Sequence, residues 1–372
     1  MTQLDAGPRP GSPDDFTGYL LPPAAYTSEE WFAREQRELF DKCWSFVGMT
    51  DDFPEIGDYA AVQVGTHPII VVRALDGRLR AFHNLCRHRG TVMLEGTGNV
   101  RTGISCLYHH WNYGLDGALR RVPQLDRFNG MDMRDWGLLP AAIGEAMGMV
   151  FVHPDPEAGS LAEWLGDFDD RTGSFQPETL VQGVRLTYEM EANWKLFAEN
   201  HIDVLHLWYL HARTLAEYDH AASNWTSVGR HWAFYEPPRH GRLVPPTLEA
   251  SGMPIFPHIS ENWYGSGAHL IFPNLPMATG ANFWMTYQVI PLSAGRSRLD
   301  MRLRSLPGTD PALLQAFADA SRDLFEHEDI KACELMQKAM ASPRFQVGPL
   351  ARSHEEPIWV FQRNVLDYVP RR

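Results

Sequence analysis

The segments "CRHRG" (residues 86–90) and "CLYHHW" (residues 106–111) each place a cysteine within three residues of a histidine, in a chain with only four cysteines. Counted from Cys86, the pattern is C-x-H, seventeen further residues, then C-x-x-H. Thiolates and imidazoles gathered in two short clusters are typical of a metal site. Two cysteines and two histidines suit either a tetrahedral zinc ion or an iron–sulfur cluster, so the ligand types alone leave both open. The candidate ligands are Cys86, His88, Cys106 and His109.

The composition is that of a globular protein with no expected affinity for polyanions. Of the 372 residues, 44% are hydrophobic and 21% are charged, and the formal net charge is −13. This charge argues against nucleic acid or an anionic membrane surface as a partner. The start, "MTQLDAGPRPGSPDDF", lacks the features of a signal peptide, and no apolar run is long enough to predict a membrane span. Cys43 and Cys333 are expected to be reduced thiols, which fits a cytoplasmic protein.

The length favours two domains. Residues 1–25, rich in Pro, Gly and Asp, are expected to form a mobile arm, and "SEEWFAREQRELFDKC" (28–43) has the serine cap and apolar spacing of a helix. We therefore assign residues 1–43 to an arm and helix that pack with the second domain. From 44 to 155, short alternating runs and a hairpin signal at "LDGR" (75–78) predict a small all-β domain.

Residues 156–372 mix strand and helix patterns. The stretch "LTYEMEANWKLFAENHIDVLHLWYLH" (186–211) begins like a strand and becomes helical, and residues from about 260 to 306 alternate again. A long helix is expected to start at "TDP" (309–311) and to stop before Pro343. The fold class predicted for the chain is α+β, with an all-β domain followed by a domain that has an antiparallel sheet and at least one long helix.

Histidines and acids also gather in the second domain, in the last part of that stretch. On a continuous helix, Asp203 and His206 are three residues apart and share a face. His206 and His211 are five residues apart, which is about 140° around an ideal helix. They can bind one metal only if the helix ends or distorts before His211. His201 is more simply explained as a hydrogen-bonded polar residue of the helix.

The two cysteine–histidine segments resemble the Rieske motif of the Rieske non-haem iron oxygenases, C-x-H-R-G, a spacer, then C-x-Y-H-G-W. The match covers all four ligand positions and the flanking residues Arg89, Gly90, Tyr108 and Trp111. It implies a [2Fe–2S] cluster with cysteines on one iron and histidines on the other, rather than zinc. His110 stands where the family has glycine, and its side chain is tolerable if the backbone avoids positive φ.

Residues 193–211 resemble the same family's mononuclear iron motif, N-W-K followed by E-N-x-x-D-x-x-H-x-x-x-x-H, and Asn200 matches it too. The family holds Fe(II) with two histidines and one carboxylate, which leaves positions open for O₂ and substrate. The resemblance implies that His206 and His211 are the histidine ligands.

The carboxylate ligand is expected far downstream. The stretch "EDIKACELMQ" (328–337) resembles the family's E-D-x-x-x-x-E-x-x-Q helix and identifies Asp329 as the third ligand. Glu326 and Glu328 are nearby alternatives.

The family resemblance, from about residue 40 to the end, implies a Rieske domain followed by a helix-grip catalytic domain. It further implies a head-to-tail homotrimer in which the cluster of one subunit lies near the iron of the next. Asp203 is the residue that matches the family's bridge, linking His206 to His109 of the partner subunit. A carboxylate between two imidazoles also suits the acceptor that metal-bound histidines need.

The function implied is that of an oxygenase component that uses O₂. No G-x-G-x-x-G fingerprint is present, so NAD(P)H is expected to act through a separate flavin or iron–sulfur reductase, with or without a ferredoxin. An electron carrier or a zinc-stapled binding protein would not need the second domain with its two histidines.

The expected substrate is a small organic molecule that is hydroxylated or demethylated. The C-terminal sequence resembles the branch with choline, glycine betaine and carnitine oxygenases, whose substrates are quaternary ammonium compounds. Aromatic side chains of the second domain can cage such a cation, or they can simply be core. The alternative substrate is a neutral aromatic or natural-product scaffold. The candidate pocket residues are Trp208, Trp232, Tyr235 and Trp263.

Overall fold

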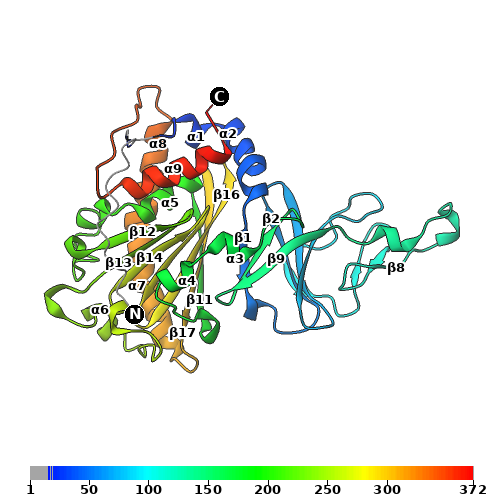
Figure 1. The fold of residues 1–372 in the computed structure, drawn as a ribbon, viewed down its shortest axis with the longest axis horizontal. Coiled ribbons are helices and arrows are strands. Elements are labelled where there is room, and N and C mark those ends of the chain that lie inside the picture. The colour runs from blue at the N-terminus through cyan, green and yellow to red at the C-terminus, as the bar shows by residue number, and fades with distance from the viewer. Residues whose placement is uncertain (1–15, 17, 19, 372) are drawn as a thin grey trace. The chain divides into compact units, whose positions relative to one another are not determined.

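The computed structural model describes residues 16, 18 and 20–371, and it divides into two compact units (Figure 1). One unit is Glu35–Trp164, and the other joins Met1–Arg34 to Leu165–Arg372. Most of the arm predicted for residues 1–25 lies outside the described residues.

The sheets of the unit Glu35–Trp164 are antiparallel, as the alternating sequence predicts, and short helical turns and loops connect their strands. Its larger sheet has the order β1-β10-β9-β4-β3-β2-β5, and a smaller sheet has the order β6-β7-β8. The strands of the larger sheet are β1 (Ser45–Met49), β2 (Asp58–Val64), β3 (His67–Arg73), β4 (Leu79–His83), β5 (Thr97–Asn99), β9 (Pro140–Ala146) and β10 (Met149–His153). The smaller sheet contains β6 (Ile104–Ser105), β7 (Asn112–Tyr113) and β8 (Leu119–Arg121).

The hairpin between β3 and β4 forms at the predicted turn. The Gly77 N–H donates to the carbonyl of Ala74 at 2.9 Å, and Gly77 has a φ of +79°, which favours glycine. Four consecutive apolar residues of β3, Ile69 to Val72, are fully buried. They contribute alternately to the two hydrophobic clusters of this unit, so both faces of β3 are covered.

The other unit combines one long antiparallel sheet with helices. The sheet order is β11-β17-β16-β15-β14-β13-β12. Its strands are β11 (Val181–Met190), β12 (Asn224–Val228), β13 (His231–Glu236), β14 (Ser266–Ile271), β15 (Leu275–Gly280), β16 (Phe283–Ser293) and β17 (Arg296–Ser305). The helices are α1 (Ala24–Thr27), α2 (Glu29–Arg34), α4 (Phe168–Arg171), α5 (Trp194–Ile202), α6 (Pro246–Ala250), α7 (Pro311–Leu324), α8 (Ile330–Met340) and α9 (Glu356–Tyr368), while α3 (Leu161–Leu165) contains the boundary between the units.

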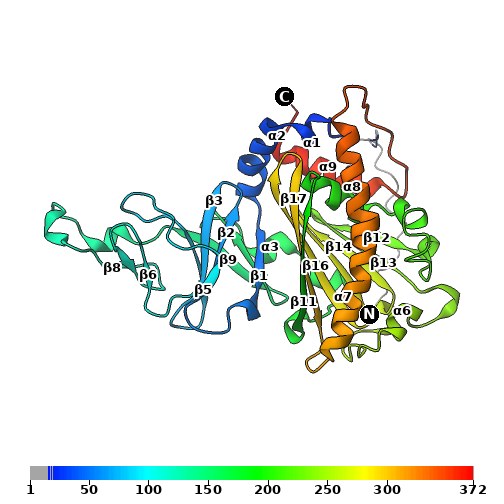
Figure 2. The same cartoon turned by 180° about the vertical axis from the view of Figure 1, so that it is seen from behind.

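Helices α7 and α8 cross this sheet as one long rod, seen in orange in Figure 2. The rod starts where the sequence predicts, because the Asp310 side chain accepts a hydrogen bond from the Ala312 N–H at 2.9 Å and Pro311 occupies the first turn. It ends at Met340, before Pro343. A π-helical turn, Phe325–Asp329, interrupts it. No sequence pattern indicates this turn, which inserts an extra residue into the helix.

The segment before residue 35 is tied to this unit through a buried network. The hydroxyl of Tyr26 in α1 donates to Glu199 of α5 at 2.6 Å, and Gln362 of α9 donates to the same carboxylate at 3.0 Å. None of the helices formed by the described residues combines the length and the apolar character needed to cross a bilayer.

Candidate metal centres

Two loops of similar shape carry the four predicted cluster ligands. The first follows β4, and the second joins β6 to β7. In each loop the cysteine carbonyl accepts a hydrogen bond from the N–H four residues later, Gly90 to Cys86 and His110 to Cys106, both at 2.9 Å. Gly90 has a φ of +74° and His110 a φ of +54°. The backbone at His110 therefore does not avoid positive φ, and the expectation that it does so is wrong. His110 adopts the left-handed conformation that glycine takes in the matching loop.

In these loops the two thiols lie together, and the two imidazoles lie together. Cys86 and Cys106 are buried, whereas His88 and His109 are only half-buried. The two imidazoles face each other with their Nδ1 atoms 3.1 Å apart. Trp111 stacks on the His88 ring with the centroids 4.9 Å apart, which fixes that ring. Two adjacent thiols and two adjacent imidazoles are the donor set of a Rieske [2Fe–2S] cluster.

The electrostatics of these groups suit metal binding. Burial lowers the pKa of His88, with a further contribution from His109, so the imidazole is neutral and can act as a ligand. Burial raises the pKa of Cys86. At Cys106 burial is outweighed by hydrogen bonds from the backbone of Tyr108 and His109, so its pKa lies below the usual value. A metal would remove both thiol protons, since thiolates are the binding form.

The second predicted centre starts at the end of α5. This helix ends at Ile202, and a 3₁₀ turn, Leu205–Trp208, follows it. Asp203 therefore caps the helix, and it does not share a helical face with His206 as the sequence had suggested. Its Oδ1 accepts hydrogen bonds from the backbone N–H groups of Leu205 at 2.7 Å and His206 at 3.3 Å. The break in the helix is the distortion needed to bring His206 and His211 together.

The structure gathers His206, His211 and Asp329 in one place. Asp329 Oδ1 lies 3.7 Å from His206 Nε2 and 3.1 Å from His211 Nε2. One donor atom from each of the three residues lies within 4.8 Å of the other two. His211 and Asp329 are buried, and His206 is nearly so. Two imidazoles and one carboxylate that converge on one point fit a mononuclear Fe(II) ion with open positions.

The sequence left Glu326 and Glu328 open as alternative ligands, and the structure places both elsewhere. Glu328 Oε2 lies 2.7 Å from Nδ1 of His211, on the opposite side of the ring from Asp329, and also accepts a hydrogen bond from the Thr214 hydroxyl at 2.7 Å. Glu326 is exposed and lies 4.0 Å from an arginine of α7. The π-helical turn lets two consecutive residues, Glu328 and Asp329, reach both nitrogens of one imidazole.

Asn200 completes the surroundings of the carboxylate. Its amide donates to Asp329 Oδ1 at 2.8 Å, from the last turn of α5. His201, by contrast, directs Nε2 at the carbonyls of His269 and Met277, at 3.1 and 3.0 Å. It is thus a hydrogen-bonded structural residue, as predicted.

Burial and close contact between the imidazoles and carboxylates of the centre shift their pKa values in both directions. Burial lowers the pKa of His206 to about 4, so this imidazole is neutral at pH 7. Burial would raise the pKa of Asp329, but His211, His206 and Asn200 outweigh it and hold the pKa below its usual value. For His211, burial is outweighed by Asp329 and Glu328, which raise its pKa. Burial raises the pKa of Asp203 to about 6.

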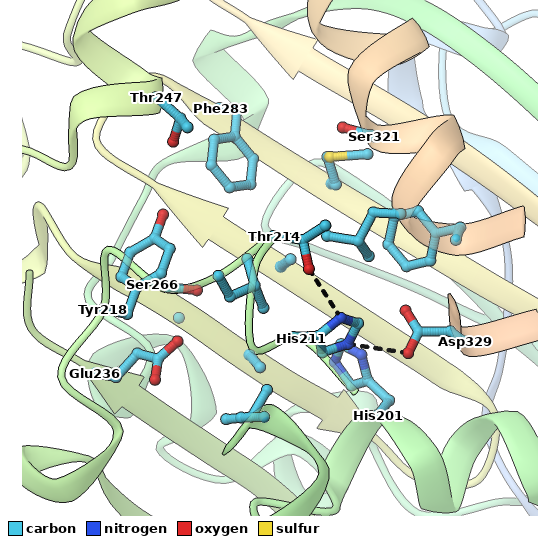
Figure 3. A pocket seen from close by; sticks show the side chains of 18 of the residues that line it. His201, His211, Thr214, Tyr218, Glu236, Thr247, Ser266, Phe283, Ser321 and Asp329 are labelled. Atoms are coloured by element: carbon cyan, nitrogen blue, oxygen red, sulfur yellow. Dashed lines mark hydrogen bonds and ion pairs between the residues drawn. The ribbon is translucent and has the colours of Figure 1, made fainter. Parts of the chain in front are cut away.

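A cavity of about 610 Å³ opens beside His206, His211 and Asp329. Figure 3 shows Asp329 and His211 at one side of it, and Tyr218, Ser266 and Glu236 grouped at the other. Much of the remaining wall is apolar. Apolar lining residues include Phe197, Phe234, Phe283, Met285, Phe317 and Phe325.

Of the four aromatic residues predicted for the pocket, only Trp232 lines this cavity. Trp232, Phe234 and Glu236 alternate along β13 and face the cavity together, so Tyr235 points to the other face of the sheet. There the Tyr235 ring packs against Trp263 at 5.4 Å. The predicted pocket is therefore wrong in three of its members. The period of two of a strand, applied to "HWAFYE" (231–236), places Trp232 and Tyr235 on opposite faces, so both cannot line one pocket. It also places Glu236 on the same face as Trp232.

Trp208 also lies outside the cavity lining. Its ring packs edge-on against His220 at 5.3 Å and against His354 at 5.1 Å. Its position follows from the 3₁₀ turn after α5, which the helical pattern of the sequence did not predict.

The fold and the two sets of candidate ligands fit a Rieske-type oxygenase with a mononuclear iron site. Residues 177–371, 195 of the 372 residues, match the model of the ring hydroxylating alpha subunit (catalytic domain), and residues 43–137 match that of the Rieske [2Fe-2S] domain. The chain therefore belongs to the ring-hydroxylating oxygenase α-subunit family of Rieske non-haem iron oxygenases. Its cofactors are a [2Fe–2S] cluster and a mononuclear iron.

Several relatives are named for glycine betaine, choline or carnitine. The chain is 28% identical over 373 residues to the glycine betaine monooxygenase oxygenase subunit of Chromohalobacter salexigens, covering 91% of this chain and 83% of the relative. It is 26% identical over 352 residues to the chloroplastic choline monooxygenase of Beta vulgaris, covering 92% and 75%. With some other glycine betaine and carnitine relatives it aligns over only about half of their length.

A solved structure shares the fold. The quaternary ammonium Rieske monooxygenase CntA in complex with L-carnitine superposes with a TM-score of 0.78. The sequences are 23% identical, and the match covers 93% of this chain and 94% of the other.

Proposed function

We propose that this chain is the oxygenase component that hydroxylates or oxidatively demethylates a small organic cation, with O₂ and externally supplied electrons. The observation that carries the proposal is the convergence of His206, His211 and Asp329 on one wall of a largely apolar cavity, in a chain that also carries a Rieske motif. The named relatives support the quaternary ammonium class rather than the neutral aromatic scaffold.

The residues around the iron site hold its ligands in one arrangement. Fe(II), when bound to His206, His211 and Asp329, supplies O₂ activation at its open positions. Glu328 accepts the Nδ1 proton of His211, so that Nε2 keeps its lone pair for the metal. Asn200 fixes the orientation of the Asp329 carboxylate. The apolar wall excludes water from the bound substrate.

The supply of electrons is proposed to cross between subunits of a homotrimer. Asp203 is the proposed bridge, because it lies three residues before His206 and its carboxylate is 4.0 Å from Nδ1 of that histidine, which is hydrogen-bonded to the backbone carbonyl of Asp203. A carboxylate can accept a hydrogen bond from a histidine on each side. A separate flavin or iron–sulfur reductase, with or without a ferredoxin, is proposed to reduce the cluster with NAD(P)H. Cys43 and Cys333 form no disulfide among the described residues, which supports a cytoplasmic location.

The test is O₂ uptake with a surrogate reductase, measured against a panel of amines, quaternary ammonium compounds and neutral aromatics. We expect product formation and O₂ uptake that both depend on a cationic substrate. Coupled turnover of the neutral aromatics alone would overturn the proposed substrate class. O₂ uptake without any oxygenated product across the panel would overturn the proposed reaction for these compounds.

A further inference from the structure

The cavity has a second polar end, which the iron site does not explain. Figure 3 shows Glu236, Tyr218 and Ser266 together, across the cavity from Asp329. Glu236 and Ser266 are paired neighbours on β13 and β14. Glu236 and Tyr218 are buried at 1% and 4% exposure, so their polar atoms face the cavity and not bulk solvent.

Glu236 is a buried carboxylate with one unused acceptor. Its Oε2 forms a hydrogen bond with Nδ1 of His220 at 2.6 Å, and His220 is 2% exposed. Its Oε1 has no hydrogen-bond partner among the described residues. Burial raises the pKa of Glu236 in spite of the hydrogen bond with His220, so the neighbouring groups do not fully compensate the buried carboxylate. A buried carboxylate is stabilised when a cation or a further donor reaches it.

The charges of the residues that line the cavity also favour a cationic ligand. None of the described residues that line the cavity is lysine or arginine, whereas four are acidic. A bound Fe(II) would offset Asp203 and Asp329. Glu236 then still faces the cavity, whereas both carboxylate oxygens of Glu217 accept hydrogen bonds from Thr247. Of the basic groups that act on Glu236, His220 and Arg239 lie outside the lining. A substrate carboxylate placed beside Glu236 would therefore meet an acid with no lysine or arginine in the lining to pair with it, which makes its burial unfavourable.

We infer that Glu236 is a specificity-determining residue that selects organic cations without a carboxylate, whose ammonium or O–H group meets its free Oε1, and that the cavity rejects zwitterionic betaines. The inference rests on the proposed function, because it takes this cavity as the substrate site. It separates this chain from relatives named for glycine betaine, whose substrate carries a carboxylate. The volume of about 610 Å³ also admits cations larger than choline.

The first experiment compares ligands and needs no variant. Calorimetric titration of the metal-loaded protein, without reductase, measures the affinity for choline, for glycine betaine and for 3,3-dimethylbutan-1-ol, the neutral isostere of choline. Benzyltrimethylammonium is the larger cation. We expect each of the two carboxylate-free cations to bind at least about tenfold more tightly than the betaine and the neutral alcohol. Equal or tighter binding of glycine betaine, an equal affinity for the neutral alcohol, or no binding of either cation would overturn the inference.

The second experiment assigns the selectivity to Glu236. Glu236→Gln keeps the side-chain shape and removes the charge, and we expect it to weaken binding of the cations about tenfold while the neutral alcohol changes by less than about twofold. Glu249→Gln is the matched control, because Glu249 is an exposed acid of α6 outside the cavity lining and its variant should bind like the wild type. The Rieske absorption spectrum of each variant reports that its cluster is loaded, and the iron content and the circular dichroism spectrum report that its catalytic unit is loaded and folded. An unchanged cation preference in folded Glu236→Gln would contradict the assignment.

These outcomes are distinct from failure of the proposed function. Selective binding of cations without oxygenated product would leave the role of Glu236 intact and contradict the proposed reaction. Coupled oxygenation of glycine betaine at the rate of choline would leave the reaction intact and contradict the role of Glu236.

Discussion

The two metal centres are built in opposite ways. The cluster ligands lie close together in the sequence, with His88 and His109 separated by 21 residues, on two loops that leave both imidazoles half-exposed. The iron site joins a turn after α5 to a π-helical turn on the long helix, and His211 is 117 residues from Glu328. A local sequence motif positions the residues of the cluster site, whereas the packing of the whole catalytic unit positions the residues of the iron site. We therefore expect each centre to be removable without loss of its counterpart.

The largest effect is expected from loss of a cluster thiolate. Cys86→Ser should abolish the Rieske absorption and electron paramagnetic resonance spectra, and with them all reductase-dependent turnover, because a serine hydroxyl does not replace the thiolate. The iron site should still bind one iron per chain. Cys43, which lies outside the Rieske motif and forms no disulfide among the described residues, offers the control, since Cys43→Ser should keep the spectrum. A Rieske spectrum that survives in the Cys86→Ser variant would show that the cluster ligands are wrongly assigned.

The variant Asp329→Ala tests the iron site while the cluster ligands stay unchanged. It should leave the Rieske spectrum unchanged and remove the mononuclear iron, so that iron falls from about three to about two atoms per chain. Turnover should fall by at least about 10³-fold, because two neutral imidazoles alone bind Fe(II) weakly. Glu326→Gln, an exposed acid in the same π-helical turn, should behave like the wild type. Full iron content in the Asp329→Ala variant would place the third ligand elsewhere.

A smaller effect is expected from a residue that contacts an iron ligand and does not itself bind the iron. Glu328→Gln should weaken iron binding about 10- to 100-fold without changing the ligand set, since the carboxylate only orients His211. The measurement is the iron retained after titration with a chelator, with the Rieske spectrum as internal reference. If retention matches that of the wild type, Glu328 does not support the ligand.

The smallest effect compares the two cluster loops with each other. Gly90 and His110 both have positive φ, so His110→Gly should relieve strain and raise stability by less than about 1 kcal/mol, after allowance for the entropy of glycine. Gly90→Ala should lower it by about 1 kcal/mol. Loss of Rieske absorbance on heating measures both. The same sign of change in both variants would contradict the shared loop conformation.

The contrast also explains what could be predicted from the sequence. The cluster ligands, the all-β domain and the cap at Asp310 rest on neighbouring residues, and local spacing is enough to find them. The iron ligands could be proposed only through the family resemblance, because the break after Ile202 and the π-helical turn before α8 have no clear sequence signal. Strands β12 and β13 were not predicted, and so the inward face of β13 with Glu236 was missed. Which residues line the pocket depends on which face of each strand is directed into it. The aromatic content of the sequence alone does not reveal this face.

The central claim is that electrons stored in the cluster are used at the iron site, and Asp203 is the proposed link between them. The decisive measurement is a single turnover: the cluster is reduced without air, the reductant is removed, and the protein is mixed with O₂ and a cationic substrate. In the wild type we expect the cluster to reoxidise quickly, with product formed in proportion. In Asp203→Asn both metals should remain bound and reoxidation should slow by at least about 10²-fold, because the amide lacks the negative charge and has a single acceptor atom for the two imidazoles. Reoxidation of that variant at the wild-type rate, with the same yield of product, would contradict this account.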